Sequence, residues 1–147
     1  MEILQSLKIE HEELHSELAR AMNAGGSTGA AAKAVSKALH PHFIKEEEYA
    51  LPPLGLLQVL AAGKITPEAG AVIAMTGKLK AGLQEMMSEH EKIVSALNNL
   101  AQAARDEKKM EFIRFAEKLK LHAQMEEQIL YPAAILVGEY LKLKSGK

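Results

Sequence analysis

Apolar residues recur along this chain at alternating intervals of three and four positions, which is the spacing of one face of an α-helix. The pattern predicts four long amphipathic helices, over residues 3–23, 30–51, 66–105 and 110–131. The third stretch contains three glycines, so we expect a break or bend near one of them. Shorter apolar patterns over 54–60 and 133–143 each predict one more short helix.

The predicted long helices are separated by short connections: a glycine-rich stretch at 25–29, which we expect to form a loop, and a polar turn at 106–109. Long amphipathic helices with short connections are typical of antiparallel bundles. We therefore predict an all-α fold, an antiparallel up-down four-helix bundle. It would carry one short extra helix between helices 2 and 3 and a short C-terminal helix, in a single domain over residues 1–147.

Each predicted helix has a histidine at a position of its buried stripe where an apolar residue is expected. Two of the helices also carry a glutamate on the stripe, four residues after the histidine, so that both side chains point the same way. Neither kind of residue belongs in an apolar core without a partner. The six residues are His11, His42, Glu46, His90, His122 and Glu126.

The sequence of residues 42–52 returns 80 residues later as residues 122–132, with His, Glu-Glu and Pro at identical offsets. Another histidine precedes each copy by 31 or 32 residues, as His11 and His90. The chain is therefore predicted to consist of two half-repeats, about 1–52 and 67–132. Each half supplies one histidine and one His-x3-Glu pair.

A single histidine on an apolar stripe is more often a hydrogen-bonded core residue than a metal ligand, and Glu47, Glu48 and Glu127 taken separately are typical of a solvated surface. Glu46 and Glu126 are different, because an unpaired carboxylate in a core costs several kcal/mol. No lysine or arginine lies near them on the four stripes. Four imidazoles and two carboxylates at one level of a bundle need a common counter-ion, and a pair of metal ions supplies it.

The type of metal follows from the ligand atoms. Imidazole nitrogen and carboxylate oxygen, without sulfur, favour iron, manganese or zinc, and the chain has no cysteine. Two glutamates from opposite helices can each bridge two ions, while two histidines per ion fill terminal positions. The set predicts a dinuclear centre with positions open to oxygen, peroxide or another small ligand.

This pattern resembles the hemerythrin-like, or HHE cation-binding, domain. The single histidines His11 and His90 and the two His-x3-Glu pairs match that family helix by helix, over nearly the whole chain. The resemblance implies two iron ions in a non-heme di-iron site, with manganese or zinc as alternative metals. It implies that Glu46 and Glu126 bridge the irons, that His11 and His42 serve one iron, and that His90 and His122 serve the other.

The sequence departs from oxygen-carrying hemerythrins, which have two histidines four apart on the third helix and five histidines in all. Here Met86 and Val94 stand four residues to either side of His90. The pair four apart lies instead on the first helix, as His11 and His15. His15 is included among the expected metal residues, although it could equally be exposed or hydrogen-bonded to a ligand. Oxygen carriers also end with a His-x4-Asp bridge, and the His-x3-Glu here argues against reversible oxygen carriage.

Three functions are compatible with these residues. The favoured hypothesis is a di-iron module that binds or senses O2, NO, or redox or iron state. The alternatives are a di-iron enzyme that consumes peroxide and a bundle that only stores metal or is stabilised by it. Tyr49 and Tyr131 are expected to pack in the core, with hydrogen bonding to ligands as the alternative.

Composition limits the classes of molecule that this protein is expected to bind. The formal net charge is −1, so nothing indicates nucleic acid or an anionic membrane surface as a partner. No apolar run reaches the length of a membrane span, and the start of the chain is acidic and unlike a signal peptide. We expect a cytoplasmic protein whose partner is a small diatomic ligand or peroxide. The sequence does not determine its oligomeric state.

Overall fold

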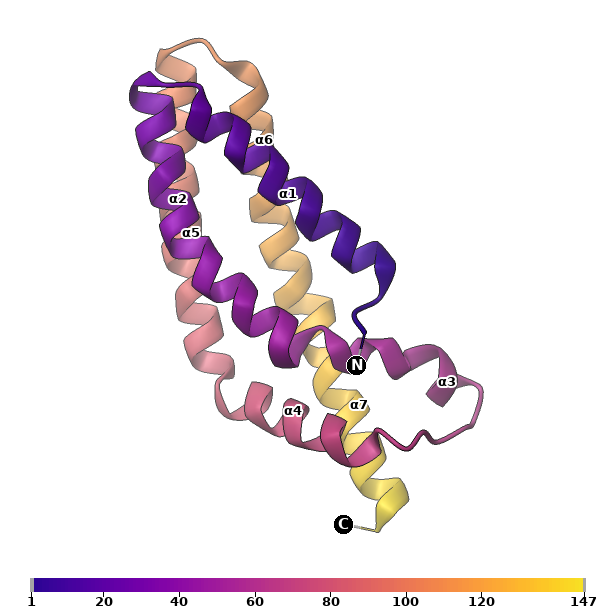
Figure 1. The fold of residues 1–147 in the computed structure, drawn as a ribbon. Helices are drawn as coiled ribbons and strands as arrows, with labels where there is room; N and C mark the ends of the chain where they lie inside the picture. The colour runs from indigo at the N-terminus through magenta and orange to yellow at the C-terminus, as the bar shows by residue number, and fades with distance from the viewer. Residues whose placement is uncertain (1, 147) are drawn as a thin grey trace.

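Helices make up almost all of the computed structural model, which describes residues 2–146 (Figure 1). No strand occurs within this range. None of its helices is both long enough and apolar enough to cross a membrane. The α-helices are α1 (Gln5–Asn23), α2 (Gly26–Lys45), α3 (Leu57–Ala61), α4 (Ala69–Ala81), α5 (Leu83–Asp106), α6 (Met110–Met125) and α7 (Tyr131–Ser145).

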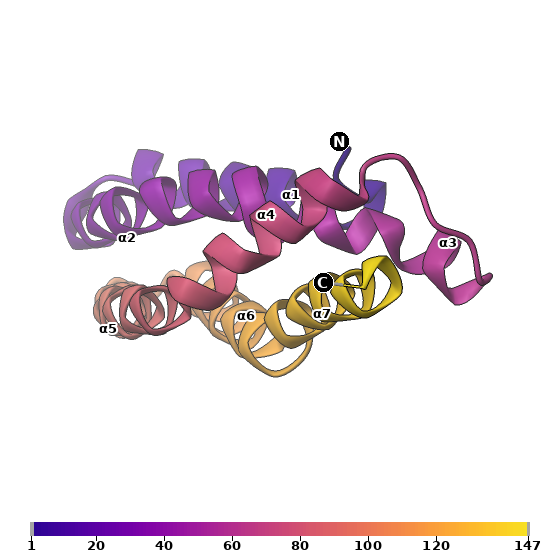
Figure 2. The same cartoon turned by 90° about the horizontal axis from the view of Figure 1, so that it is seen from below.

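Helices α1, α2, α5 and α6 run along the length of the molecule (Figure 1). Seen end-on, α1 and α2 form one layer and α5 and α6 the other (Figure 2). All four helices bury apolar residues in one shared core, which includes Leu14, Leu39, Leu97 and Leu119. The predicted stripes therefore face one another, as the three-four spacing requires.

The break predicted in the third long stretch lies at Gly82, which separates α4 from α5. Helix α4, which precedes Gly82, crosses the lower end of the molecule and packs against α7 (Figures 1 and 2). The two helices approach so closely that a Cβ atom on Gly138 would overlap the side chain of Thr76. A residue without a side chain is required there.

The predicted loop over residues 25–29 is wrong, because α2 already begins at Gly26. Gly25 and Gly26 both have positive φ angles, of 71° and 59°. Such angles are accessible to glycine at little cost and reverse the chain within two residues. Glu107 then accepts hydrogen bonds from the backbone N–H groups of Ser27 (3.2 Å) and Thr28 (2.8 Å), and so caps the helix from across the bundle.

Both halves of the chain widen into a π-helical turn, at Glu46–Ala50 and Glu126–Leu130. In the first, the N–H of Leu51 donates to the carbonyl of Glu46 at 2.8 Å, five residues back. Each turn precedes a proline, which has no N–H and crowds the carbonyl four residues earlier, so a wider turn accommodates it. Such turns are rare and often occur at functional sites. The first leads into a 3₁₀ helix, Pro52–Leu56, and the second continues directly into α7.

Candidate metal centre

The six polar residues predicted on the buried stripes come together in the middle of the molecule. Each is at most 6% exposed. Both glutamates are the first residues of the π-helical turns, each placed one helical turn after its histidine. Single histidines from α1 and α5 complete the set.

The first cluster consists of His42, Glu46, His90 and Glu126, whose ligand atoms all lie within 4.8 Å of one another. The Nε2 atoms of His42 and His90 are 2.9 Å apart. His42 Nε2 lies 3.6 Å from Glu46 Oε2, and His90 Nε2 lies 3.1 Å from Glu126 Oε1. The hydroxyl of Tyr131 also lies here and donates a hydrogen bond to Glu46 Oε2 at 2.6 Å.

The second cluster consists of His11, His122 and Glu126, with ligand atoms again within 4.8 Å of one another. His122 Nε2 lies 3.1 Å from Glu126 Oε2, and His11 Nε2 lies 3.8 Å from the same oxygen. The other oxygen of Glu46, Oε1, is 3.8 Å from His11 Nε2. Each glutamate thus directs one oxygen to each cluster.

Three of the four imidazoles are held from behind by a carboxylate at Nδ1. Glu89 contacts His42 at 2.7 Å, Glu127 contacts His90 at 3.0 Å, and Glu10 forms an ion pair with His122. A carboxylate at Nδ1 fixes the ring and leaves Nε2 free to bind a metal, as is usual for metal-bound histidine.

Two of these contacts follow the internal repeat. Glu10 and Glu89 each directly precede the single histidine of their own half, yet each holds the His-x3-Glu histidine of the other half. The two halves therefore orient each other's ligands.

His11 breaks this symmetry, because no carboxylate among residues 2–146 forms an ion pair with its Nδ1 atom. Its ring instead stacks on Phe43, with ring centroids 4.1 Å apart and planes inclined by 9°. The same Phe43 ring packs nearly perpendicular to the ring of His15, with centroids 4.9 Å apart. Aromatic packing, rather than a carboxylate, therefore sets the orientation of His11.

The charges of the clusters are strongly coupled. Burial and the Glu126 carboxylate raise the pKa of Glu46 to about 8. Burial also acts to raise the pKa of Glu126, but the neighbouring Glu46 and the imidazoles around it hold that pKa well below its ordinary value. Burial acts to lower the pKa of His122, but Glu126 raises it to about 9. Both shifts favour the protonated forms of Glu46 and His122, and metal binding must displace those protons.

Among residues 2–146, four atoms that face the clusters make ion-pair contacts at most and no hydrogen bond: His11 Nε2, His122 Nε2, Glu46 Oε1 and Glu126 Oε2. Leaving a buried polar group unsatisfied costs about 1–3 kcal/mol. Within residues 2–146, the ion pairs that Glu46 and Glu126 form are all with histidines, not with lysine or arginine. Bound cations would satisfy all four atoms at once, so these residues fit a metal centre.

The comparison with protein families agrees with this geometry. The family described as the hemerythrin HHE cation-binding domain matches residues 2–134. The chain belongs to the hemerythrin HHE cation-binding family. Searches of curated proteins and of solved structures found no match to the chain. Membership accords with the cation-binding character of the two clusters, and the hemerythrin fold accords with the all-helical architecture.

The structure groups the side chains of this hemerythrin-like site differently from two expectations. The resemblance implied that His11 pairs with His42 and His90 with His122, whereas the structure groups His42 with His90 and His11 with His122. Helices α1 and α5 each pack against both α2 and α6, so either pairing is open to the helices, and the direction of the rings decides: the Nε2 atoms of His42 and His90 point to within 2.9 Å of each other. The structure also does not bring His15 into either cluster. It lies one turn beyond His11, is exposed, and is separated from the site by Phe43.

Sequence reasoning missed the carboxylates at Nδ1 and gave Tyr131 too small a role. Glu127 was expected at the surface but contacts His90. The repeated Glu-His-Glu of residues 10–12 and 89–91 was the available signal. It could not show that each glutamate reaches across to the opposite half.

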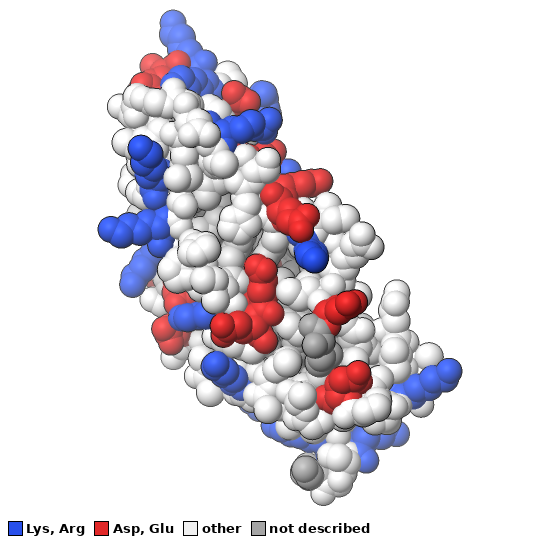
Figure 3. Space-filling view, viewed as in Figure 1, with Lys and Arg blue, Asp and Glu red and all other residues white. Residues whose placement is uncertain are grey.

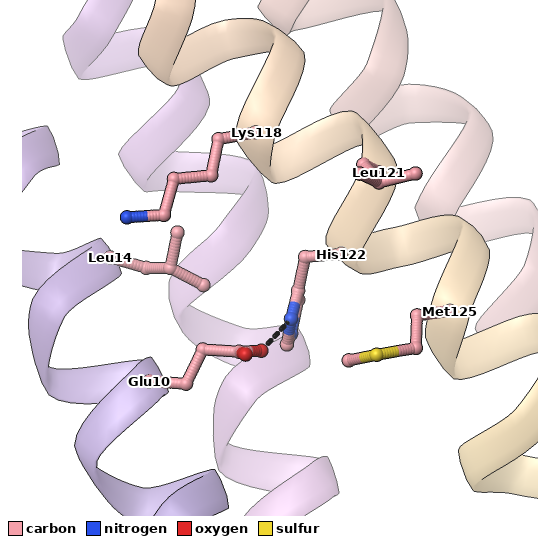
Figure 4. Close-up of a pocket in the computed structure, with 6 residues that line it drawn as sticks. All are labelled: Glu10, Leu14, Lys118, Leu121, His122 and Met125. Carbon is pink, nitrogen blue, oxygen red and sulfur yellow. Dashed lines mark ion pairs between the residues drawn. The ribbon is translucent and has the colours of Figure 1, made fainter.

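A cavity of about 170 Å³ opens between α1 and α6 and reaches His122 (Figure 4). In Figure 4 the Glu10 carboxylate and the Met125 side chain extend toward the His122 ring. The residues that line this cavity are Glu10, Leu14, Lys118, Leu121, His122 and Met125. It gives a small molecule a largely apolar approach to the second cluster.

Acidic side chains gather over the middle of the face shown in Figure 3, while lysine and arginine lie mostly toward its edges. Helix α1 and the π-helical turn after α2 expose Glu12, Glu13, Glu47 and Glu48. A concentration of negative charge raises the local concentration of cations.

Proposed function

We propose that this protein holds two iron ions and binds a small ligand of the O2, NO or peroxide class at one of them. His42 and His90 would hold the first iron, and His11 and His122 the second. Glu46 and Glu126 would bridge the two, since each directs one oxygen to either cluster. The donor atoms are all nitrogen or oxygen, which supports iron as the metal, with manganese or zinc as alternatives.

In this proposal α1, α2, α5 and α6 form the antiparallel up-down bundle of hemerythrin-like proteins. Its support is the shared core of the four helices and the short connections between α1 and α2 and between α5 and α6. Such bundles place metal ligands on facing helices, directed inward.

The unequal donor sets of the two clusters are the observation that supports ligand binding. The first cluster gathers four metal-type side chains together with the hydroxyl of Tyr131. The second gathers three, and the oxygen of Glu46 that completes it is 3.8 Å from His11. A non-heme iron with an open position can bind O2, NO or peroxide, and the second cluster is where that position would lie.

The surroundings of the second cluster favour binding over turnover of peroxide. Cleavage of an O–O bond is assisted by a positioned acid or base. Of the polar side chains lining the approach cavity, Glu10 is paired with His122, and Lys118 forms an ion pair with Glu17 at 3.2 Å. The rest of the lining is apolar, from Leu14, Leu121 and Met125.

The test is titration of the anaerobic, ferrous-loaded protein with NO and with O2, followed optically. We expect a saturating change at one ligand per two irons, and oxygen release from peroxide no faster than with free iron. Inertness toward both gases in protein that holds two irons would reject ligand binding and leave a structural or storage role. Sustained oxygen release from peroxide would establish the enzyme instead.

The approach cavity can be tested by partly filling it. Leu121→Trp places a larger side chain at the mouth and should slow the association of NO without changing the number of irons bound. Leu136→Trp is the matched control, because Leu121 and Leu136 are both 66% exposed but Leu136 lies on α7, outside this cavity. Equal association rates in the two variants would show that ligands reach the iron by another path.

A further inference from the structure

Tyr131 occupies a central place in the first cluster. It is fully buried and is the first residue of α7, directly after the π-helical turn that begins at Glu126. Its hydroxyl oxygen lies 2.6 Å from Glu46 Oε2, 3.1 Å from His42 Nε2 and 3.2 Å from His90 Nε2. The oxygen therefore touches three of the four side chains that would hold the first metal.

These distances are those between neighbouring ligands of one ion. Two donor atoms at right angles around a metal, each about 2.1 Å from it, lie about 3 Å apart. The separations of the Tyr131 oxygen from the two Nε2 atoms match this value, as does the 2.9 Å between the Nε2 atoms themselves. A cation bound by His42 and His90 would be within bonding reach of the Tyr131 oxygen.

The other buried tyrosine, Tyr49, provides a comparison, because its hydroxyl lies in an ordinary packing environment. Among residues 2–146, the hydroxyl of Tyr49 has one hydrogen-bond partner, the sulfur of Met86 at 3.9 Å, which is not a metal-type side chain of either cluster. Tyr49 belongs to the apolar cluster below the site. Tyr131 belongs to the same apolar cluster, yet its hydroxyl contacts the metal-type donors Glu46, His42 and His90.

The internal repeat shows that this feature is confined to one side of the site. Eighty residues before Tyr131, the corresponding position is Leu51, a buried residue without a donor atom. The first cluster thus has an oxygen that the second lacks. The second cluster therefore has fewer donor atoms than the first, which agrees with an open coordination position at the second cluster.

We propose that Tyr131 binds the metal of the first cluster through its phenolate oxygen. The assignment rests on the proposed function, since it requires a metal between His42 and His90. As the oxygen–metal bond forms, the phenol O–H bond breaks and its proton leaves to solvent. The hydrogen bond to Glu46 is lost in the same step, which frees Glu46 Oε2 to bind the metal. Tyrosinate is an established iron ligand in proteins.

The test is resonance Raman and visible spectroscopy of protein loaded with ferrous iron and then oxidised in air. Tyrosinate bound to ferric iron gives a visible charge-transfer band, and excitation in that band enhances the vibrations of the tyrosine ring. We expect both signals in the wild-type protein. Tyr131→Phe should lose them while it still holds two irons per chain.

The chain contains three tyrosines, which provides a control that does not depend on how well Tyr131→Phe folds. The Tyr49→Phe/Tyr140→Phe double variant leaves Tyr131 as the only tyrosine and should keep both signals. Loss of the signals in this variant, or their persistence in Tyr131→Phe, would overturn the assignment. Two irons without tyrosinate vibrations in the wild type would overturn it alone, whereas failure to bind iron would overturn the proposed function as well.

Discussion

Glu89→Gln tests whether a carboxylate behind His42 holds that ring ready for metal. The Glu89 carboxylate lies 2.7 Å from His42 Nδ1 and also pairs with Lys45. Glutamine keeps an oxygen that can accept the Nδ1–H hydrogen bond but removes the negative charge. The substitution therefore separates the electrostatic contribution from the loss of the hydrogen bond.

The expected magnitude follows from the geometry. Loss of a carboxylate that orients a metal-bound histidine typically lowers metal affinity by about 10–100-fold, or about 1.4–2.7 kcal/mol. Because the hydrogen bond survives, we expect Glu89→Gln to weaken affinity by about tenfold. Glu127→Gln should have a smaller effect, since Glu127 is more exposed than Glu89 (36% against 22%) and its contact with His90 is longer, at 3.0 Å.

The assay is competition between each iron-loaded variant and a chelator, followed by the iron retained per chain. Glu91→Gln is the matched control, because Glu91 is an exposed residue on the same helix. This substitution removes the same charge as Glu89→Gln. Retention by Glu89→Gln equal to that of Glu91→Gln would refute the reasoning that Glu89 supports a metal ligand.

Three further predictions concern stability. Chelation of the metal should lower Tm, because a ligand at about 1,000 times its Kd stabilises the folded state by about 4 kcal/mol; an unchanged Tm would contradict folded-state metal binding. Gly138→Ala should destabilise the folded protein by about 1–3 kcal/mol, because the added Cβ atom overlaps Thr76. Gly77→Ala is the control, because Gly77 lies in an open part of α4, and it should stabilise the protein by about 0.5–1 kcal/mol. Equal effects of the two substitutions in urea unfolding would contradict the close contact of α4 with α7. Hydrogen bonds from Thr28 lower the pKa of Glu107 from 4.5 to about 2, so its stabilising effect is complete above about pH 4.5 and is lost as the pH falls toward 2. Glu107→Gln should flatten the pH dependence of stability in that range, and an unchanged acid profile would show that the cap contributes nothing.

Local patterns were sufficient to predict most of the helices. The three-four spacing of apolar residues located α1 and α6, and glycine anticipated the break at Gly82. The stretch 25–29 was misjudged because its helix start depends on Glu107, about 80 residues away, which caps it. A contact between distant residues leaves no periodic signal in the sequence.

The site shows the same division. That His42 and Glu46 share a helix face is a local property, and the sequence predicts it. Helices α1 and α5 each neighbour both α2 and α6, so which histidines share a cluster depends on where the rings point between the helices, and the sequence does not show this. The role of Tyr131 was hidden for a further reason: the π-helical turn after Glu126 adds a residue to the helical turn and alters the direction in which later side chains point.

The number of metal ions per chain tests the central claim most directly. It should be measured by elemental analysis of protein loaded anaerobically with ferrous iron and freed of excess metal. We predict two ions per chain for the wild type, and one for the His11→Ala/His122→Ala double variant, in which the donors of the first cluster remain. Fewer than two ions in the wild type would contradict the dinuclear site, and two ions in the double variant would contradict the assignment of the second cluster.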